Sequence, residues 1–182
     1  LFELLVSPLS RYAPMRTIAL TIAALLSSVC VAQNNEVIER SLTADAKREH
    51  RLIDGQEVVL QLSRQGVFKG KPSERQDYSS FYIPQQTVFV LGAKLISFEH
   101  EYQTRYVGCC VNPGNAVILQ PTRGTAEIET FSRRNGCKYS VGNEIFYVPQ
   151  KATKALSKPE RDSLVEVSCK DNYLFDAQGR TP

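Results

Sequence analysis

Leu95–Cys110, with the sequence LISFEHEYQTRYVGCC, is the stretch that decides the fold. Apolar or aromatic residues alternate with polar ones through most of it, a period of two that is typical of a β-strand with one buried face. The alternation predicts an inward-facing set made of Ile96, Phe98, His100, Tyr102, Thr104 and Tyr106. Glu99 and Glu101 then fall on the opposite face of the same strand.

Other short, β-rich segments flank this strand, and most of them are bounded by Gly, Pro or Asn. We predict strands at Glu57–Leu62, Phe81–Ile83, Thr87–Leu91, Ala116–Gln120, Thr125–Ser132, Cys137–Val141, Glu144–Val148 and Leu164–Cys169. The dipeptide Asn135-Gly136 favours the tight turn of a β-hairpin, so we expect it to join two of these strands. Helical patterns are confined to Asn34–Leu52 and to a turn within Lys151–Asp162.

The pattern predicts a mainly β fold. We expect an antiparallel up-and-down barrel or sandwich of about 8–9 strands, with an N-terminal helix and a short C-terminal helical segment. This order, over Asn34–Cys169, resembles that of the lipocalins, which are secreted barrels that hold a small ligand. The chain has no tryptophan, so the Gly-x-Trp of many lipocalins is missing, and Gly55-Gln56-Glu57 stands in its place. The resemblance implies a ligand-binding interior, which we expect to be lined by Phe98, His100, Tyr102 and Tyr106.

The segment that starts at Met15 has the features of a secretion signal. Arg16 supplies a positive charge, Ile18–Leu26 is apolar, and small residues precede a predicted cleavage site after Ala32. The apolar run is shorter than the roughly 20 residues of a membrane span. We therefore expect residues 15–32 to be a signal peptide and residues 33–182 to form a single secreted domain. Because Leu1–Pro14 precedes Met15, we expect it to be an upstream or non-native segment.

Four cysteines remain after this predicted cleavage, and an even number in an oxidising compartment predicts two disulfides. Cys109 and Cys110 are neighbours in an extended segment, so their side chains should point to opposite faces. We expect one of them to pair with Cys137 and the other with Cys169. Because no Cys-x-x-Cys pair occurs, we expect no metal site, and no motif predicts a cofactor.

The formal net charge of the chain is +3, which is too small for a general nucleic-acid-binding surface. We expect a monomer whose partner is a small-molecule ligand or an extracellular protein, with no nucleic acid and no membrane span after cleavage. Arg133, Arg134 and Lys138 cluster around the predicted hairpin turn, where they are candidates for contact with an acidic partner.

The run Phe98-Glu99-His100-Glu101-Tyr102 resembles the aromatic-x-His-x-aromatic strand of small fungal guanyl-specific ribonucleases. That resemblance implies acid–base cleavage of RNA by a histidine working with a carboxylate and an arginine. In this chain, however, both glutamates fall on the face opposite His100, and no later histidine exists. We therefore expect a secreted, non-catalytic binding protein that carries a small ligand. The alternatives are a protein-binding effector or inhibitor, and a ribonuclease-like hydrolase.

Overall fold

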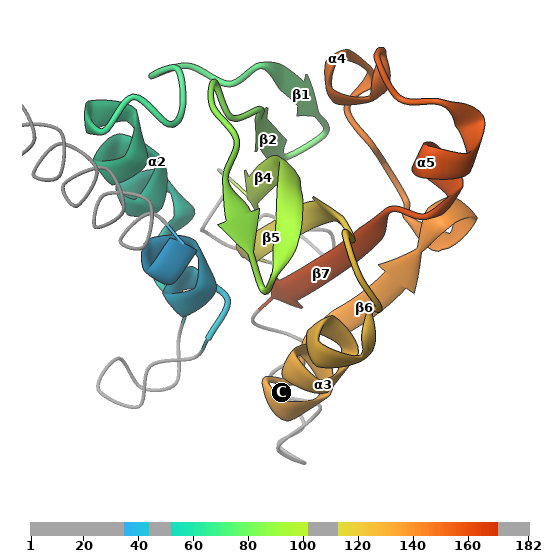
Figure 1. Cartoon of the computed structure of the whole chain (residues 1–182). Helices are drawn as coiled ribbons and strands as arrows, with labels where there is room; N and C mark the ends of the chain where they lie inside the picture. Colours follow the sequence, from blue (N-terminus) through green and yellow to red (C-terminus); the bar gives the residue numbers. More distant parts are fainter. Residues whose placement is uncertain (1–34, 44–51, 102–112, 171–182) are drawn as a thin grey trace, which may run out of the picture. The chain divides into compact units, whose positions relative to one another are not determined.

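The computed structural model describes residues 35–43, 52–101 and 113–170, all of which belong to one compact unit that begins at Gln33. An antiparallel sheet of seven strands forms its centre (Figure 1). The strands are β1 (Glu74–Gln76), β2 (Ser79–Tyr82), β3 (Phe89–Val90), β4 (Ala93–Glu101), β5 (Gly114–Gln120), β6 (Lys138–Val141) and β7 (Val165–Lys170).

The strands lie in the order β1-β2-β4-β5-β7-β6, and β3 pairs with β4 outside this path. The predicted mainly β, antiparallel fold is confirmed at this level. The order departs from an up-and-down meander because β7 returns to lie between β5 and β6 and pairs with both. Within the described residues the sheet does not close, and β1 and β6 stand at its two ends.

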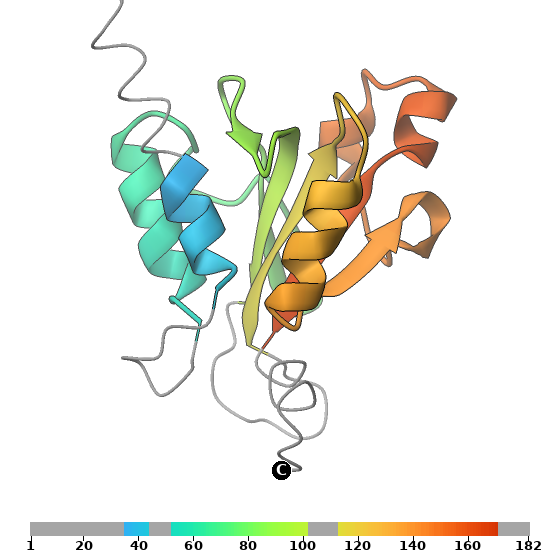
Figure 2. The ribbon, with the colours of Figure 1, turned by 60° about the horizontal axis from the view of Figure 1, so that its bottom comes forward.

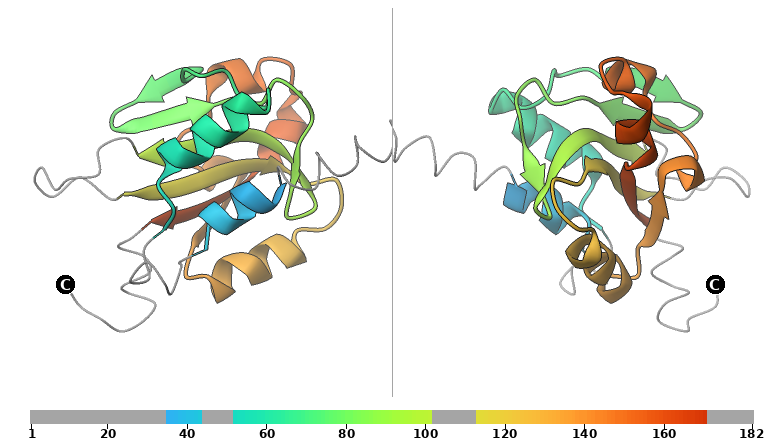
Figure 3. Two further views of the ribbon diagram at one scale, coloured as in Figure 1. Left: turned by 90° about the vertical axis from the view of Figure 1, so that its left-hand side faces the viewer. Right: turned by 45° about the vertical axis from the view of Figure 1, so that its right-hand side comes forward.

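Helical elements cover both faces of the sheet. Residues 35–41 are helical, in agreement with the predicted N-terminal helix, and α2 (Gly55–Arg64) and α3 (Ala126–Arg134) follow. These three helices cover one face, whereas α4 (Gln150–Thr153) and α5 (Lys158–Asp162) lie on the other side of the sheet (Figures 2 and 3). Of the helices in the described ranges, none combines the length and apolar character that a membrane span requires.

Two apolar cores correspond to the two faces. The larger core joins the three-helix face to the sheet through residues such as Ile38, Val59, Leu62, Phe98 and Ile128. The smaller core lies on the other face, where Ile96 and Ile118 pack against Ile145 and Leu164. Because both faces are covered, every residue of β4 from Leu95 to Glu101 is buried.

The predicted strand Glu57–Leu62 is wrong, because this segment is the middle of helix α2. Asp54 caps the helix by accepting a hydrogen bond from the Gln56 backbone N–H at 2.9 Å. The buried residues Val58, Val59 and Leu62 follow helical spacing and form one apolar stripe against the sheet. Burial of that stripe outweighs the β-propensity of the two valines.

The predicted strand Thr125–Ser132 is likewise wrong, because it forms most of helix α3. Asn135 then ends α3, with its backbone N–H bonded to the Phe131 carbonyl, and Gly136 takes a φ of +64°. Asn135-Gly136 therefore terminates a helix instead of turning a hairpin. Glu144–Val148, the third incorrect strand, contains the end of the short 3₁₀ helix η2 (Gly142–Glu144) and an irregular segment.

The C-terminal half otherwise follows the sequence prediction. Strands β5, β6 and β7 match the predicted segments to within two residues at either end. The helical turn predicted in Lys151–Asp162 is present as α5, in which Pro159 lies in the first turn. Ser157 and Glu160 cap it reciprocally.

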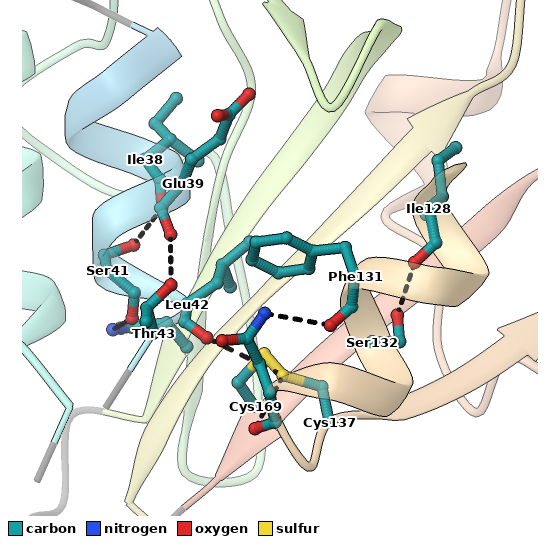
Figure 4. The surroundings of a disulfide bond; sticks show 12 residues. Ile38, Glu39, Ser41, Leu42, Thr43, Ile128, Phe131, Ser132, Cys137 and Cys169 are labelled. Carbon is teal, nitrogen blue, oxygen red and sulfur yellow. Dashed lines mark hydrogen bonds between the residues drawn. A yellow bond between two sulfur atoms is a disulfide. The ribbon is translucent and has the colours of Figure 1, made fainter. Parts of the chain in front are cut away.

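The disulfide connectivity differs from the prediction. Cys137 and Cys169 are bonded to each other, so neither pairs with Cys109 or Cys110, which lie outside the described residues. The bond joins the residue before β6 to β7, and the Leu42 carbonyl oxygen lies 3.6 Å from Cys137 Sγ (Figure 4). The adjacent strands β6 and β7 bring the two cysteines together, a pairing that the linear sequence does not reveal.

Candidate functional site

A pocket of about 730 Å³ lies on the sheet face that the three helices leave free, and we call it the sheet-face pocket. Strands β1, β2, β4, β6 and β7, the turn between β1 and β2 and the segment after η2 all contribute residues to it. Its lining residues are Gln76, Asp77, Tyr78, Ser79, Phe81, Glu99, Glu101, Lys138, Phe146, Tyr147, Glu166, Ser168 and Lys170.

Strand alternation explains which side chains reach the pocket. In β7, Val165, Val167 and Cys169 belong to the larger core, whereas Glu166, Ser168 and Lys170 line the pocket. In β4, Glu99 and Glu101 line the pocket, as predicted for the face opposite His100. Ala116 of β5 pairs with both Glu99 and Ser168, so only a methyl group separates these two polar residues in the sheet.

Glu99 is held by two donors. It is 7% exposed, and its Oε1 atom accepts a hydrogen bond from Ser79 Oγ at 2.6 Å. Lys170 Nζ lies 3.3 Å from the same oxygen. These two contacts hold the Glu99 side chain in place at the wall of the pocket.

Glu166 has a different environment. It is 8% exposed, and within the described residues it forms neither a hydrogen bond nor an ion pair. Burial, together with the negative charge of Glu99, raises the pKa of Glu166 from 4.5 to about 7, although Lys170 and Lys138 oppose the shift. At neutral pH this carboxyl group is poised between its protonated and ionised forms.

Aromatic side chains form one wall of the pocket. The Tyr147 hydroxyl donates a hydrogen bond to Glu74, and this bond is the main reason why the pKa of Tyr147 rises to about 12. The Tyr147 ring packs on Phe81 with 5.1 Å between ring centroids. Phe146, the preceding residue, is 86% exposed and lies at the rim. The packed rings of Phe81 and Tyr147 and the solvent-exposed ring of Phe146 therefore border the carboxylates.

The ligand-binding residues predicted from the sequence lie elsewhere. Phe98 and His100 are buried in the layer between the sheet and the helices, and neither lines a described pocket. His100 stacks on Tyr82 with 5.7 Å between ring centroids, and burial lowers the pKa of its imidazole. Tyr102 and Tyr106 are outside the described residues.

Gly55 explains the close fit around His100. It is the first residue of α2, and a Cβ atom placed on it would lie 2.2 Å from His100 Cβ and 2.3 Å from Asn115 Oδ1. Asn115 also donates to the Ser41 and Ile53 carbonyl oxygens at 2.9 and 2.8 Å. These contacts fix the start of α2 against the sheet, so this region is packed core in the described structure.

The three predicted partner-binding residues do not form a hairpin tip. Arg133 and Arg134 are in the last turn of α3, and Lys138 begins β6. Lys138 pairs with Ser168 of β7, so it does not face Arg133 across a hairpin. All three are exposed, and Lys138 lines the sheet-face pocket, whereas Arg134 lines a separate hollow of about 480 Å³ beside α3.

Sequence reasoning missed Glu166, Ser168, Lys170, Phe146 and Tyr147 as site residues. The alternation of apolar and polar residues in Val165–Lys170 was the available signal for the first three. No local pattern marks Phe146 and Tyr147, which reach the pocket from an irregular segment.

Within the described residues, no group of three or more His, Cys, Asp or Glu side chains could hold a metal ion. The site is thus made of carboxylates, two lysines, hydroxyl groups and aromatic rings. No protein-family model, no curated protein and no solved structure matches the chain.

Proposed function

We propose that this chain is a secreted protein that binds a small ligand in the sheet-face pocket. The observation that carries the proposal is the combination of buried carboxylates and aromatic rings around a pocket of about 730 Å³. This volume falls in the range typical of sites for small organic ligands, about 300–1,000 Å³. Secretion is inferred from the signal-like segment that starts at Met15.

The proposal keeps the ligand-binding function expected from the sequence but moves the site to the other face of the sheet. The expected interior around Phe98 and His100 is filled by α2 and its neighbours. The sheet-face pocket instead offers polar groups that converge on one volume from β4 and β7, as ligand recognition requires.

Replacing Phe146 by alanine is expected to weaken ligand binding about tenfold or more, because a ligand in the pocket would remove this large exposed ring from water. Native mass spectrometry of the secreted protein should show a non-covalent adduct that denaturation removes. Phe146→Ala protein should carry much less of it. Since the side chain is 86% exposed, the stability of the variant should stay within about 0.5 kcal/mol of wild type.

Phe89→Ala is the matched control, because Phe89 is also an exposed phenylalanine but lines a different hollow. It should leave the adduct unchanged. A wild-type protein without any adduct, or equal losses in both variants, would contradict the proposed site.

A second candidate function is acid–base hydrolysis in the same pocket. Glu99 is bound by Ser79 and Lys170, whereas Glu166 lacks such donors in the described ranges and its pKa is raised to about 7. Two carboxyl groups with such different environments are typical of a hydrolytic acid–base pair. Glu166 would donate its proton to the leaving oxygen as the bond breaks, and Glu99 would accept a proton from the attacking water.

Hydrolysis predicts that the wild-type protein releases nitrophenol from at least one nitrophenyl glycoside near pH 6. Glu166→Gln, which removes the proton donor, should lower that rate about a hundredfold or more. No release from a broad set of such glycosides would favour the binding function.

A further inference from the structure

The sheet-face pocket is negatively charged in a chain that is positive overall. Its lining contains four carboxylates, from Asp77, Glu99, Glu101 and Glu166, but only two lysines, Lys138 and Lys170. The lining therefore contains more acidic than basic side chains. The whole chain has a formal net charge of +3, so the excess of acidic residues in the pocket is opposite in sign to the net charge of the chain.

The excess is concentrated at Glu166. Lys170 lies against Glu99 at 3.3 Å, and Lys138 is exposed at the start of β6. Glu166 is more than nine-tenths buried and has no hydrogen bond or ion pair among the described residues. An ionised carboxylate in that position is unfavourable unless a donor or a cation reaches it.

The aromatic wall adds a second requirement. Phe146 is 86% exposed and Tyr78 is 40% exposed, and both line the pocket. These surfaces favour a ligand with an apolar or aromatic part, which removes them from water. Aromatic faces also attract cations, so they reinforce the preference set by the carboxylates.

We propose that the ligand of the sheet-face pocket is an organic cation, with its ammonium group beside Glu166 and its apolar body against Phe146. This inference rests on the ligand-binding function proposed above and names the chemical class of the ligand. The ammonium group supplies the donors that Glu166 lacks within the protein.

Binding of such a cation is coupled to the proton on Glu166. The burial and the Glu99 charge that raise the pKa of Glu166 to about 7 keep the carboxyl group largely protonated at pH 5.5. A protonated carboxyl group attracts an ammonium group less than a carboxylate does. The affinity for the cation therefore rises between pH 5.5 and 8, whereas the affinity for a neutral ligand of the same shape does not.

Three probes that share an indole ring but differ in charge test this inference. Tryptamine is a cation, tryptophol is neutral and indole-3-acetate is an anion. Isothermal titration of wild-type protein at pH 8 should give tryptamine the lowest Kd, at least about tenfold below that of tryptophol, with indole-3-acetate the weakest. At pH 5.5, and in Glu166→Gln at pH 8, the ratio between tryptamine and tryptophol should fall to about threefold or less.

Two controls separate this inference from the function on which it rests. Phe89→Ala should keep the full charge preference, and Phe146→Ala should weaken all the probes that bind. If tryptophol binds as well as tryptamine, or if Glu166→Gln keeps the preference, the pocket binds ligands but the cation inference is overturned. Absence of tryptamine binding at pH 8 also overturns it, whereas the adduct comparison decides the proposed function independently.

Discussion

Replacing Cys137 and Cys169 together by alanine is expected to lower the free energy of unfolding by about 3 to 4 kcal/mol. The disulfide closes a sequence separation of 32 residues, and the loss of that constraint increases the conformational entropy of the unfolded chain. For a domain of this size the loss corresponds to roughly 10 °C in melting temperature. Urea unfolding of the variant and the wild type measures the difference directly.

The position of the bond makes this effect large. The enclosed segment contains β6, α4, α5 and most of β7, so the disulfide limits the freedom of the part of the described structure that follows α3. Cys169 is fully buried in the larger core, which is why alanine is a better substitution than serine.

Peptide mapping supplies the control for this prediction. A digest without reductant should contain a peptide pair that joins Cys137 to Cys169, and reduced wild-type protein should be as unstable as the double variant. A link from either cysteine to Cys109 or Cys110, or a variant as stable as the wild type, would contradict the bond seen in the structure.

Strands were predictable from the sequence where apolar and polar residues alternate within a short segment. Strands β4, β5 and β7 show this, because their apolar residues recur at every second position or form short buried runs. The β-bulge between Leu95 and Ser97 limits the prediction even there, because it shifts the register and places Ile96 in the smaller core.

Helices α2 and α3 were missed because a short segment rich in residues that favour strands does not distinguish the helical period of 3.6 residues from the strand period of two. In α2, Val58, Val59 and Leu62 fit a helix face as well as a strand. The better signals were at the ends. Asp54 is a good N-cap residue, and in α3 the acidic first turn and basic last turn complement the helix dipole.

The site was predictable only in part, because it depends on the strand order. Alternation alone placed Glu99 and Glu101 on one face. Their proximity to Glu166 requires that β7 pair with β5, which in turn pairs with β4. That pairing links residues far apart in the sequence, so no local pattern contains it.

Glu166→Gln is expected to stabilise the protein above pH 7 by about 3 kcal/mol and to have little effect near pH 4.5. The pKa of Glu166 is raised from 4.5 to about 7 in the folded state, chiefly by burial. The folded protein therefore binds the proton more tightly than the unfolded chain does. The stability that Glu166 contributes to the folded state is fully present below pH 4.5 and is lost as the pH rises through 7.

Glutamine keeps the shape of a protonated glutamate but does not ionise, so the variant avoids this loss. A shift from 4.5 to about 7 corresponds to about 3 kcal/mol at 1.36 kcal/mol for each pH unit. Urea unfolding of both proteins at pH 4.5, 6 and 8 should show a difference that grows with pH. Glu144→Gln, which changes an exposed glutamate, is the control and should differ little from the wild type at any pH.

The pH profile of the wild type alone does not isolate Glu166, because His100 titrates with the opposite sign. Burial lowers the pKa of His100. The stability that this residue contributes to the folded state is therefore present above pH 6.5 and is lost as the pH falls. The difference between Glu166→Gln and the wild type cancels the His100 contribution, since His100 is the same in both. A difference that is constant, or that shrinks as the pH rises, would mean that Glu166 ionises freely. The pocket would then lack the unmatched carboxylate on which the preference for a cationic ligand depends.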